Sequence, residues 1–277
     1  MKHTVTKLLA GLGMALCLAT AHGFDLGREL KNAASGLQKP DKLAGLGGYS
    51  EEEEIAIGRQ IAGNLLGAAP LVKDKQLQKY INNVGRWVAS QSERPDLAWH
   101  FGVIESSDIN AFAAPGGYIF VTRGLYRLLS DEAELAGVLA HEVGHVIRKH
   151  HLKILQQSQL VDLGGKLLAK QAGGNDKIRN LIGSGAEIVS RSLDKSAEFE
   201  ADRIAVVLAA RAGYDAFGLP VVLQEIGHAG SDSSVALLFK THPHPDERLT
   251  KLGDAMDDSR FDGLKGQALP GRFYRVK

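Results

Sequence analysis

The chain has 277 residues, of which 44% are hydrophobic, and its formal net charge is +1. A chain of this length supports one large domain or two small ones, with the hydrophobic content of an ordinary globular protein. The near-zero charge and the lack of a basic patch exclude a protein whose main partner is a nucleic acid.

Residues 1–23 have the pattern of a signal peptide. Lys2 and Lys7 supply basic charge, an apolar run follows over residues 8–20, and small residues at 19–21 offer a cleavage site. The apolar run is too short for a membrane-spanning helix, so we expect no integral membrane span after the signal is removed. The alternative is a retained N-terminal anchor.

Cys17 is the only cysteine, and Leu16 precedes it where a lipoprotein signal needs a small residue. We therefore expect an exported protein that is not lipidated. A mature chain without cysteine suits an oxidising compartment, and we predict a periplasmic location. Residues 24–49 are rich in glycine, alanine, leucine and lysine, which predicts a linker.

We predict a folded domain over residues 50–260 and a C-terminal tail over residues 261–277. Ser50 precedes a run of glutamates that includes Glu53, and this pattern predicts a helix that begins with a capping box. Residues 73–91 have apolar residues at helical spacing and predict a second helix.

The next segments predict a small sheet. Residues 96–105 alternate between apolar and polar positions, as in a strand, and residues 110–121 predict a two-stranded hairpin around residues 115–117. An exposed edge of this hairpin could bind a peptide backbone as an added strand. Asn110 and Ala111 are our candidates for that contact. The alternative is that neighbouring chain covers the edge.

The pattern HEVGH, from His141 to His145, lies within an apolar segment that predicts a buried helix. Positions i and i+4 share one helical face, so the two histidines can bind one metal ion. A catalytic zinc site accepts such ligands and keeps one position for water. Glu142 then predicts the general base of a zinc hydrolase with one zinc ion per chain. The alternative is a surface helix with two histidines by chance.

A third ligand must come from elsewhere in the chain. His151 has the position of the last histidine in the pattern HExxHxxGxxH, but residue 148 is arginine instead of the glycine that turns the chain. We therefore expect the helix to continue, with His150 and His151 at its polar end. Residues 152–195 are amphipathic and interrupted by glycines, which predicts two short helices that pack over the active-site helix or serve as a lid.

Glu198 is the only glutamate after the HEVGH pattern that is followed four residues later by aspartate. Glu198 and Asp202 share one face of a predicted helix. We predict that Glu198 is the third zinc ligand and that Asp202 holds a ligating imidazole by its other nitrogen. Glu200 lies on another face and is expected to be an acid of the first helical turn. The alternative makes all three residues ordinary acids of that turn.

Four segments in this order carry a family resemblance: NAFAAPGGYIFVTRGL (110–125), SDEAELAGVLAHEVGH (130–145), SAEFEADRIA (196–205) and THPHPDERL (241–249). They resemble the HtpX/BepA-type family of zinc metallopeptidases, which is related to the gluzincin-type CAAX prenyl proteases. The resemblance implies endopeptidase activity, zinc, and an extended segment beside the zinc cleft. The expected fold is a mainly helical α+β, gluzincin-type domain with a small β-sheet beside the active-site helix.

The loop before the last predicted helix holds His242 and His244 between prolines, and Arg248 follows. Prolines stiffen the loop, so His242 can be held at the cleft at little entropic cost. It could donate to the reaction's oxyanion, alone or with Arg248, or it could bind zinc as a fourth ligand and switch the enzyme off. His244 competes for both roles. The alternative is a helix-capping loop whose histidines face solvent.

We expect polypeptide substrates, in particular misfolded or unassembled envelope proteins, with components of outer-membrane protein assembly as partners. Two other functions stay open. The protein could be a chaperone-like binding module with a latent protease site, or an amidase that acts on cell-wall peptides.

Overall fold

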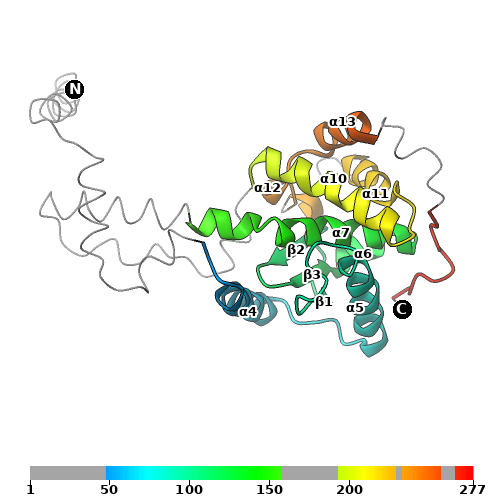
Figure 1. Ribbon diagram of the computed structural model, residues 1–277. Helices are drawn as coiled ribbons and strands as arrows, with labels where there is room; N and C mark the ends of the chain where they lie inside the picture. Colours follow the sequence, from blue (N-terminus) through cyan, green and yellow to red (C-terminus); the bar gives the residue numbers. More distant parts are fainter. Residues whose placement is uncertain (1–47, 157–192, 229–232, 237, 257–265, 277) are drawn as a thin grey trace, which may run out of the picture. The chain divides into compact units, whose positions relative to one another are not determined.

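The computed structural model describes residues 48–156, 193–228, 233–236, 238–256 and 266–276 (Figure 1). The predicted signal peptide, residues 24–47 of the predicted linker and residues 157–192 of the segment predicted to form two short helices lie outside this part. The described residues from position 49 onward belong to one compact unit. Among the described helices, none has both the length and the apolar character needed to cross a membrane.

Two capped helices open the described chain, α4 (Glu51–Ala68) and α5 (Lys75–Ala89). The Ser50 hydroxyl accepts the Glu53 N–H, and the Glu53 carboxylate accepts the Ser50 N–H, so the predicted capping box is confirmed. The Asp74 side chain accepts the first free N–H groups of α5. Both caps satisfy backbone donors that a helix leaves unpaired at its start.

The sheet has three strands, β1 (His100–Ile104), β2 (Ala111–Ala114) and β3 (Tyr118–Thr122), in the order β1-β3-β2. β2 and β3 form the predicted antiparallel hairpin, and β1 pairs with β3 in parallel. Gly116 and Gly117 make the hairpin turn with φ of +73° and +91°, which residues with a side chain rarely adopt. β2 is thus an edge strand, paired only with β3 within the described residues.

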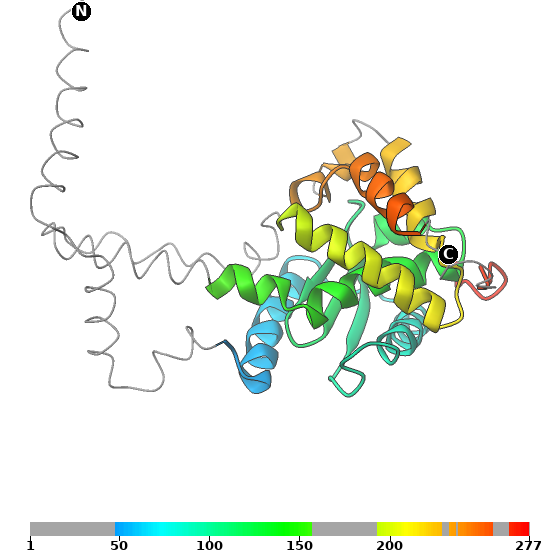
Figure 2. The same ribbon diagram turned by 45° about the horizontal axis from the view of Figure 1, so that its top comes forward.

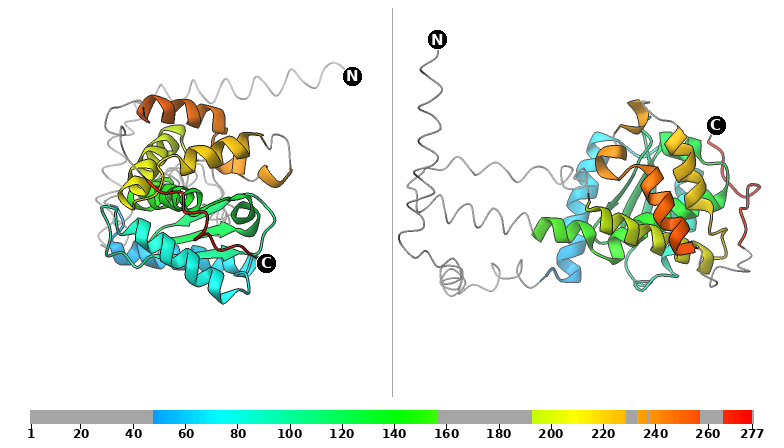
Figure 3. Two further views of the ribbon diagram at one scale, coloured as in Figure 1. Left: turned by 90° about the vertical axis from the view of Figure 1, so that its right-hand side faces the viewer. Right: turned by 90° about the horizontal axis from the view of Figure 1, so that it is seen from above.

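Helix α7 (Glu132–Ile147) occupies the middle of the domain, and all its residues except Ile147 are buried. Figure 1 shows the sheet on one side of α7 and further helices on the other, and the left view of Figure 3 agrees. These helices are α10 (Lys195–Arg211), α11 (Gly218–His228) and α13 (Pro245–Met256). The short helix α6 (Arg123–Leu128) lies between β3 and α7, and the short elements η1 (Ser233–Val235) and α12 (Leu238–Thr241) lie between α11 and α13.

The two faces of the sheet bury against different helices. Val103, Ile119 and Val121 share the main hydrophobic core with residues of α5 and α7. Ile104 and Phe120 instead pack against α4. The mainly helical α+β class with a small sheet beside α7 is confirmed, because the HEVGH helix lies between the sheet and the C-terminal helices.

Helices α7 and α10 cross closely, as Figure 2 shows. At Gly144, an added Cβ would lie only 3.2 Å from the Cα of Ala201. The glycine inside the HEVGH pattern therefore lets the backbone of α10 approach α7, which brings the side chains of both helices to one site.

Helix α7 ends at Ile147, so our expectation that it continues was wrong. Lys149 has φ of +54°, the left-handed conformation that ends many helices, and the chain is helical again over residues 150–156. An ion pair holds this turn, because Lys149 Nζ lies 3.2 Å from Oε2 of the buried Glu54. His150 and His151 are consequently 3% and 7% exposed and do not form a polar helix end.

Candidate metal centre

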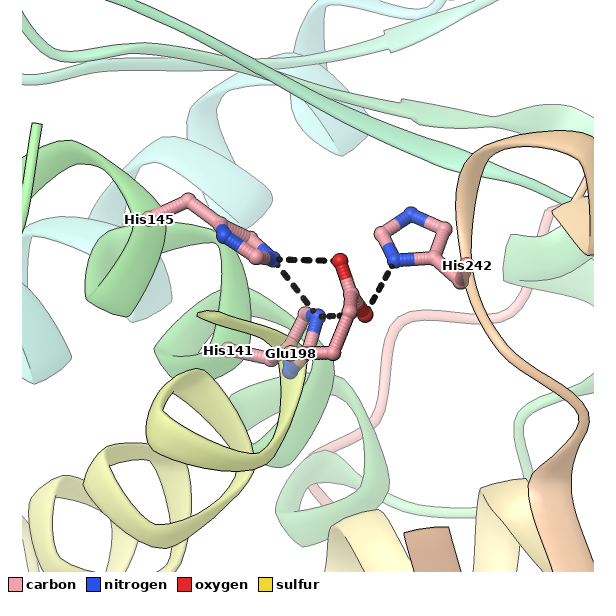
Figure 4. Close-up of side chains that lie close together, drawn as sticks. All are labelled: His141, His145, Glu198 and His242. Atoms are coloured by element: carbon pink, nitrogen blue, oxygen red, sulfur yellow. Dashed lines mark hydrogen bonds and ion pairs between the residues drawn. The ribbon is translucent and has the colours of Figure 1, made fainter. Parts of the chain in front are cut away.

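Four buried side chains point toward one another: His141 and His145 from α7, Glu198 from α10, and His242 from the segment after α12 (Figure 4). One donor atom of each lies within 4.8 Å of the other three. The Nε2 atoms of His141 and His145 are 3.0 Å apart. Nε2 of His145 also lies 3.4 Å from Oε1 of Glu198. One face of α7 thus presents both imidazoles to α10, as their i, i+4 spacing predicts.

A buried ion pair lies behind His141. Nδ1 of His141 is 2.9 Å from Oδ1 of Asp202, so the ring N–H donates to the carboxylate and Nε2 keeps its lone pair for the cluster. Arg248 donates to both oxygens of Asp202, from Nε at 2.9 Å and from Nη2 at 2.6 Å. Burial alone would raise the pKa of Asp202, but Arg248 brings that pKa well below its usual range. Asp202 therefore stays ionised and orients the His141 ring.

The donor set fits a zinc ion. Oε1 of Glu198 is buried and has no hydrogen-bond partner among the described residues, although most buried carboxylate oxygens have one. Burial alone would raise the pKa of Glu198, yet the His242 and His145 rings bring it well below its usual range. Burial lowers the pKa of His145 well below its ordinary value and keeps that imidazole neutral. An ionised carboxylate and neutral imidazoles are ligands that zinc accepts.

Glu142 lies beside this group and lines a small cavity. The cavity measures about 10 Å³, close to the smallest volume that holds one water molecule. Its walls come from the edge strand β2, from Glu142 on α7 and from residues near positions 151, 193 and 242. The lining residues are Ala111, Phe112, Ala113, Glu142, His151, Leu193, Thr241 and His242. Burial raises the pKa of Glu142, which is 3% exposed. A raised pKa suits a carboxyl group that takes up a proton and later returns it.

The predicted substrate contacts, Asn110 and Ala111, lie where β2 begins. Ala111 lines the cavity, and its N–H donates to Oδ1 of the fully buried Asn110 at 2.9 Å. Nδ2 of Asn110 has no hydrogen-bond partner in the described part of the chain. The His244 side chain is 54% exposed and lies outside the donor group. The fold therefore brings His242, and not His244, to the metal site.

Sequence reasoning missed two contacts behind His145. Nδ1 of His150 lies 2.9 Å from Nδ1 of His145, and Nε2 of His150 lies 3.3 Å from Oε2 of Glu200. Glu200 also forms an ion pair with Arg148. Our expectation that Glu200 is only an acid of the first helical turn was therefore wrong. His151 lines the cavity, and burial lowers its pKa to about 4. The one available signal was a pair of adjacent histidines just before an apolar segment.

Comparison with known proteins gives a family and several relatives. The sequence profile described as peptidase family M48 matches residues 75–255, more than half of the chain. The chain is 32% identical over 219 residues to the beta-barrel assembly-enhancing protease of Escherichia coli (strain K12), which covers 75% of this chain and 45% of that protein. It is 31% identical over 210 residues to the Yersinia pestis protein of the same name, which covers 73% and 43%.

A more distant relative is the mitochondrial metalloendopeptidase OMA1 of Arabidopsis thaliana. The two are 29% identical over 185 residues, which covers 67% of this chain and 37% of that protein. The chain thus spans less than half the length of each of these three relatives.

Proposed function

The chain belongs to peptidase family M48, and we propose that it is a zinc-dependent endopeptidase that hydrolyses internal peptide bonds of polypeptides. The observation that carries this proposal is the convergence of His141, His145 and Glu198 beside the buried Glu142. Three protein ligands for one zinc ion leave a position for water, as catalytic zinc sites do.

Glu142 is the general base of the proposed reaction. Its carboxylate takes a proton from a water molecule while the water oxygen bonds to the scissile carbonyl carbon. Glu142 then delivers that proton to the peptide nitrogen as the C–N bond breaks, which yields a carboxylate and an amine. When bound, the zinc ion polarises the carbonyl and lowers the pKa of the water. The buried surroundings of Glu142 support both proton transfers, since they raise its pKa.

The edge strand β2 is the proposed substrate-binding strand. Ala111 and Ala113 line the same cavity as Glu142, and within the described residues β2 pairs with β3 alone. A peptide added along this edge would form main-chain hydrogen bonds, which do not depend on the substrate's side chains. Nδ2 of Asn110 is a buried donor with no partner in the described residues, which supports a polar contact from Asn110 to the substrate. Because these main-chain contacts would not select particular side chains, we expect the enzyme to cleave internal peptide bonds in many sequences.

His242 is the proposed latch of this site. Its Nδ1 lies 2.7 Å from Oε2 of Glu198. A fourth protein donor takes the position that an attacking water needs, as in closed structural zinc sites. The cavity of about 10 Å³ is far too small for a peptide, which agrees with a resting state. Arg248 holds Asp202 by two hydrogen bonds, and its Nη2 lies 3.3 Å from Nδ1 of His141, so we infer that it orients the His141 ring and does not act on the oxyanion.

We expect His242→Ala to raise basal proteolysis by about tenfold or more, if the open state is populated at about 10% or less in the native protein. Initial rates on an unfolded protein, with zinc content measured on the same samples, test this. His244→Ala is the matched control and should leave the rate unchanged, since its ring is largely exposed. A fall of about a hundredfold with zinc retained would support the oxyanion donor instead. An unchanged rate would contradict both roles.

The natural substrates are proposed to be misfolded or unassembled envelope proteins, with outer-membrane assembly components as partners. Two relatives are named beta-barrel assembly-enhancing proteases, and residues 1–23 have the pattern of an export signal. Together they support a periplasmic location. A chaperone-like module with a latent protease site is the second candidate, favoured by the small volume of the cavity and the four converging donors.

The deciding experiment offers the purified protein an unfolded polypeptide, such as casein, and purified peptidoglycan. We expect internal cleavage of casein, its loss after chelator treatment, and its return when zinc is added. Removing the metal abolishes turnover because only the loaded site polarises the carbonyl. Release of peptides from peptidoglycan with intact casein would identify a cell-wall amidase. Binding of casein without cleavage, in the His242→Ala variant as well, would identify a chaperone-like module.

A further inference from the structure

The turn after α7 returns the chain to the metal site. Lys149 adopts φ of +54°, and the next residue, His150, is 3% exposed although it follows two basic residues. The turn is anchored to α4 by the ion pair between Lys149 and the buried Glu54. His150 therefore packs directly behind His145, one of the two histidine ligands.

The hydrogen-bond pattern assigns one arrangement of protons. To bind zinc through Nε2, His145 must carry its proton on Nδ1, and the only described partner within reach is Nδ1 of His150, at 2.9 Å. Nδ1 of His150 must then accept, which leaves the proton of His150 on Nε2. That nitrogen faces Oε2 of Glu200 at 3.3 Å, where a carboxylate accepts it. All three groups are satisfied by this single arrangement.

We propose that His150 and Glu200 are positioning residues for the metal, because they hold the His145 ring in the tautomer and orientation that presents Nε2 to zinc. This inference rests on the metal site of the proposed function but not on its substrate. A metal-bound histidine usually donates its other N–H to a carboxylate, a carbonyl or water. His141 follows that rule directly with Asp202, whereas His145 reaches its carboxylate through an intervening imidazole.

The hydrogen bond between His145 and His150 should contribute more to zinc binding than the hydrogen bond between His150 and Glu200. His150 is buried, so leaving the His145 N–H without an acceptor costs the desolvation of a buried donor. Glu200 has a side chain that is 37% exposed and shares its charge with Arg148, whose Nε lies 3.0 Å from Oε1 of Glu200. Water can replace part of what an exposed carboxylate provides. Loss of the His150 acceptor should therefore weaken zinc binding more than neutralisation of Glu200.

The test measures zinc affinity of the full chain by competition with a chromophoric chelator. We expect His150→Leu to bind zinc about 10–100-fold more weakly than wild type. His150→Asn places an amide oxygen near the position of Nδ1 and should recover most of the affinity. Glu200→Gln should bind zinc measurably more weakly than wild type, by a factor below about tenfold. The matched control is His100→Leu, a histidine of β1 that stacks on Tyr118 and belongs neither to the donor group nor to the cavity wall, and its zinc affinity should stay unchanged.

A second readout separates positioning from packing. The visible spectrum of the cobalt-substituted protein reports ligand geometry, and we expect it to change in His150→Leu and to be restored in His150→Asn. An unchanged affinity and spectrum in His150→Leu would overturn the proposal, as would equal losses in the Leu and Asn variants. Thermal unfolding shows whether His150→Leu is folded. If it is not, the zinc affinity of Glu200→Gln tests the proposal, and a wild-type affinity in that variant overturns it. Failure of the wild-type chain to bind zinc would instead refute the proposed function.

Discussion

Replacing Glu142 with glutamine is expected to lower peptide-bond hydrolysis by about 10²–10⁴-fold while the protein keeps its zinc. The amide has nearly the shape of the carboxylate but cannot accept the proton of the attacking water. Glu142 contributes none of the four donor atoms that converge at the site, so the metal should remain bound. The measurements are kcat/KM on an unfolded protein and zinc content by elemental analysis.

Glu105→Gln is the control for this variant. Glu105 forms an ion pair with Arg123 at the surface, beyond the end of β1, and its loss should not change turnover. Wild-type turnover in a Glu142→Gln protein with about one zinc ion per chain would refute the general base. Loss of zinc together with activity would show that Glu142 supports the metal site instead.

Glu198→Ala is expected to weaken zinc binding by more than about 100-fold, beyond the 10–100-fold typical of residues that hold a ligand from behind. The substitution removes the anionic donor and leaves only imidazoles around the ion. Glu198 is fully buried, and its Oε1 makes no hydrogen bond among the described residues, so the loss of that oxygen should affect the metal site more than the fold. Chelator competition gives the affinity, and thermal unfolding of the metal-free protein checks that the variant folds.

Two other glutamates serve as comparisons for the loss of zinc affinity in Glu198→Ala. Glu200→Ala, on the same helix, should lose affinity by about tenfold or less, because its carboxylate reaches the site only through His150. Glu247→Ala removes an exposed ion pair with Lys195 and should leave zinc affinity unchanged. Equal zinc affinities for the Glu198 and Glu200 variants would contradict the ligand assignment.

Local patterns predicted most of the elements that carry the metal site. The HEVGH spacing puts His141 and His145 on one face of any helix, and the same i, i+4 rule pairs Glu198 with Asp202. Both rules depend on helix geometry alone, so they hold before tertiary contacts are known. The hairpin was predictable for a similar reason, since two consecutive glycines after a proline favour a tight turn.

The support around the ligands was not predictable in this way. The turn at Lys149 uses a residue that carries no turn signal, and its ion pair with Glu54 joins segments far apart in the sequence. The burial of His150 follows from that turn and was missed with it. Likewise, the direction of Arg248 depends on how α13 packs against α10, which no local periodicity records.

The two histidine ligands depend on very different lengths of chain. The hydrogen-bond partner of His145 is His150, only five residues later, so this contact closes a very short loop of chain. His141 depends on Asp202 from another helix, and Asp202 depends on Arg248 a further 46 residues along. Closing such loops costs entropy that the packing of the C-terminal helices must offset. A local opening of α13 would therefore release Arg248 and loosen His141 while His145 keeps its partner, which couples metal retention to the docking of the last described helix.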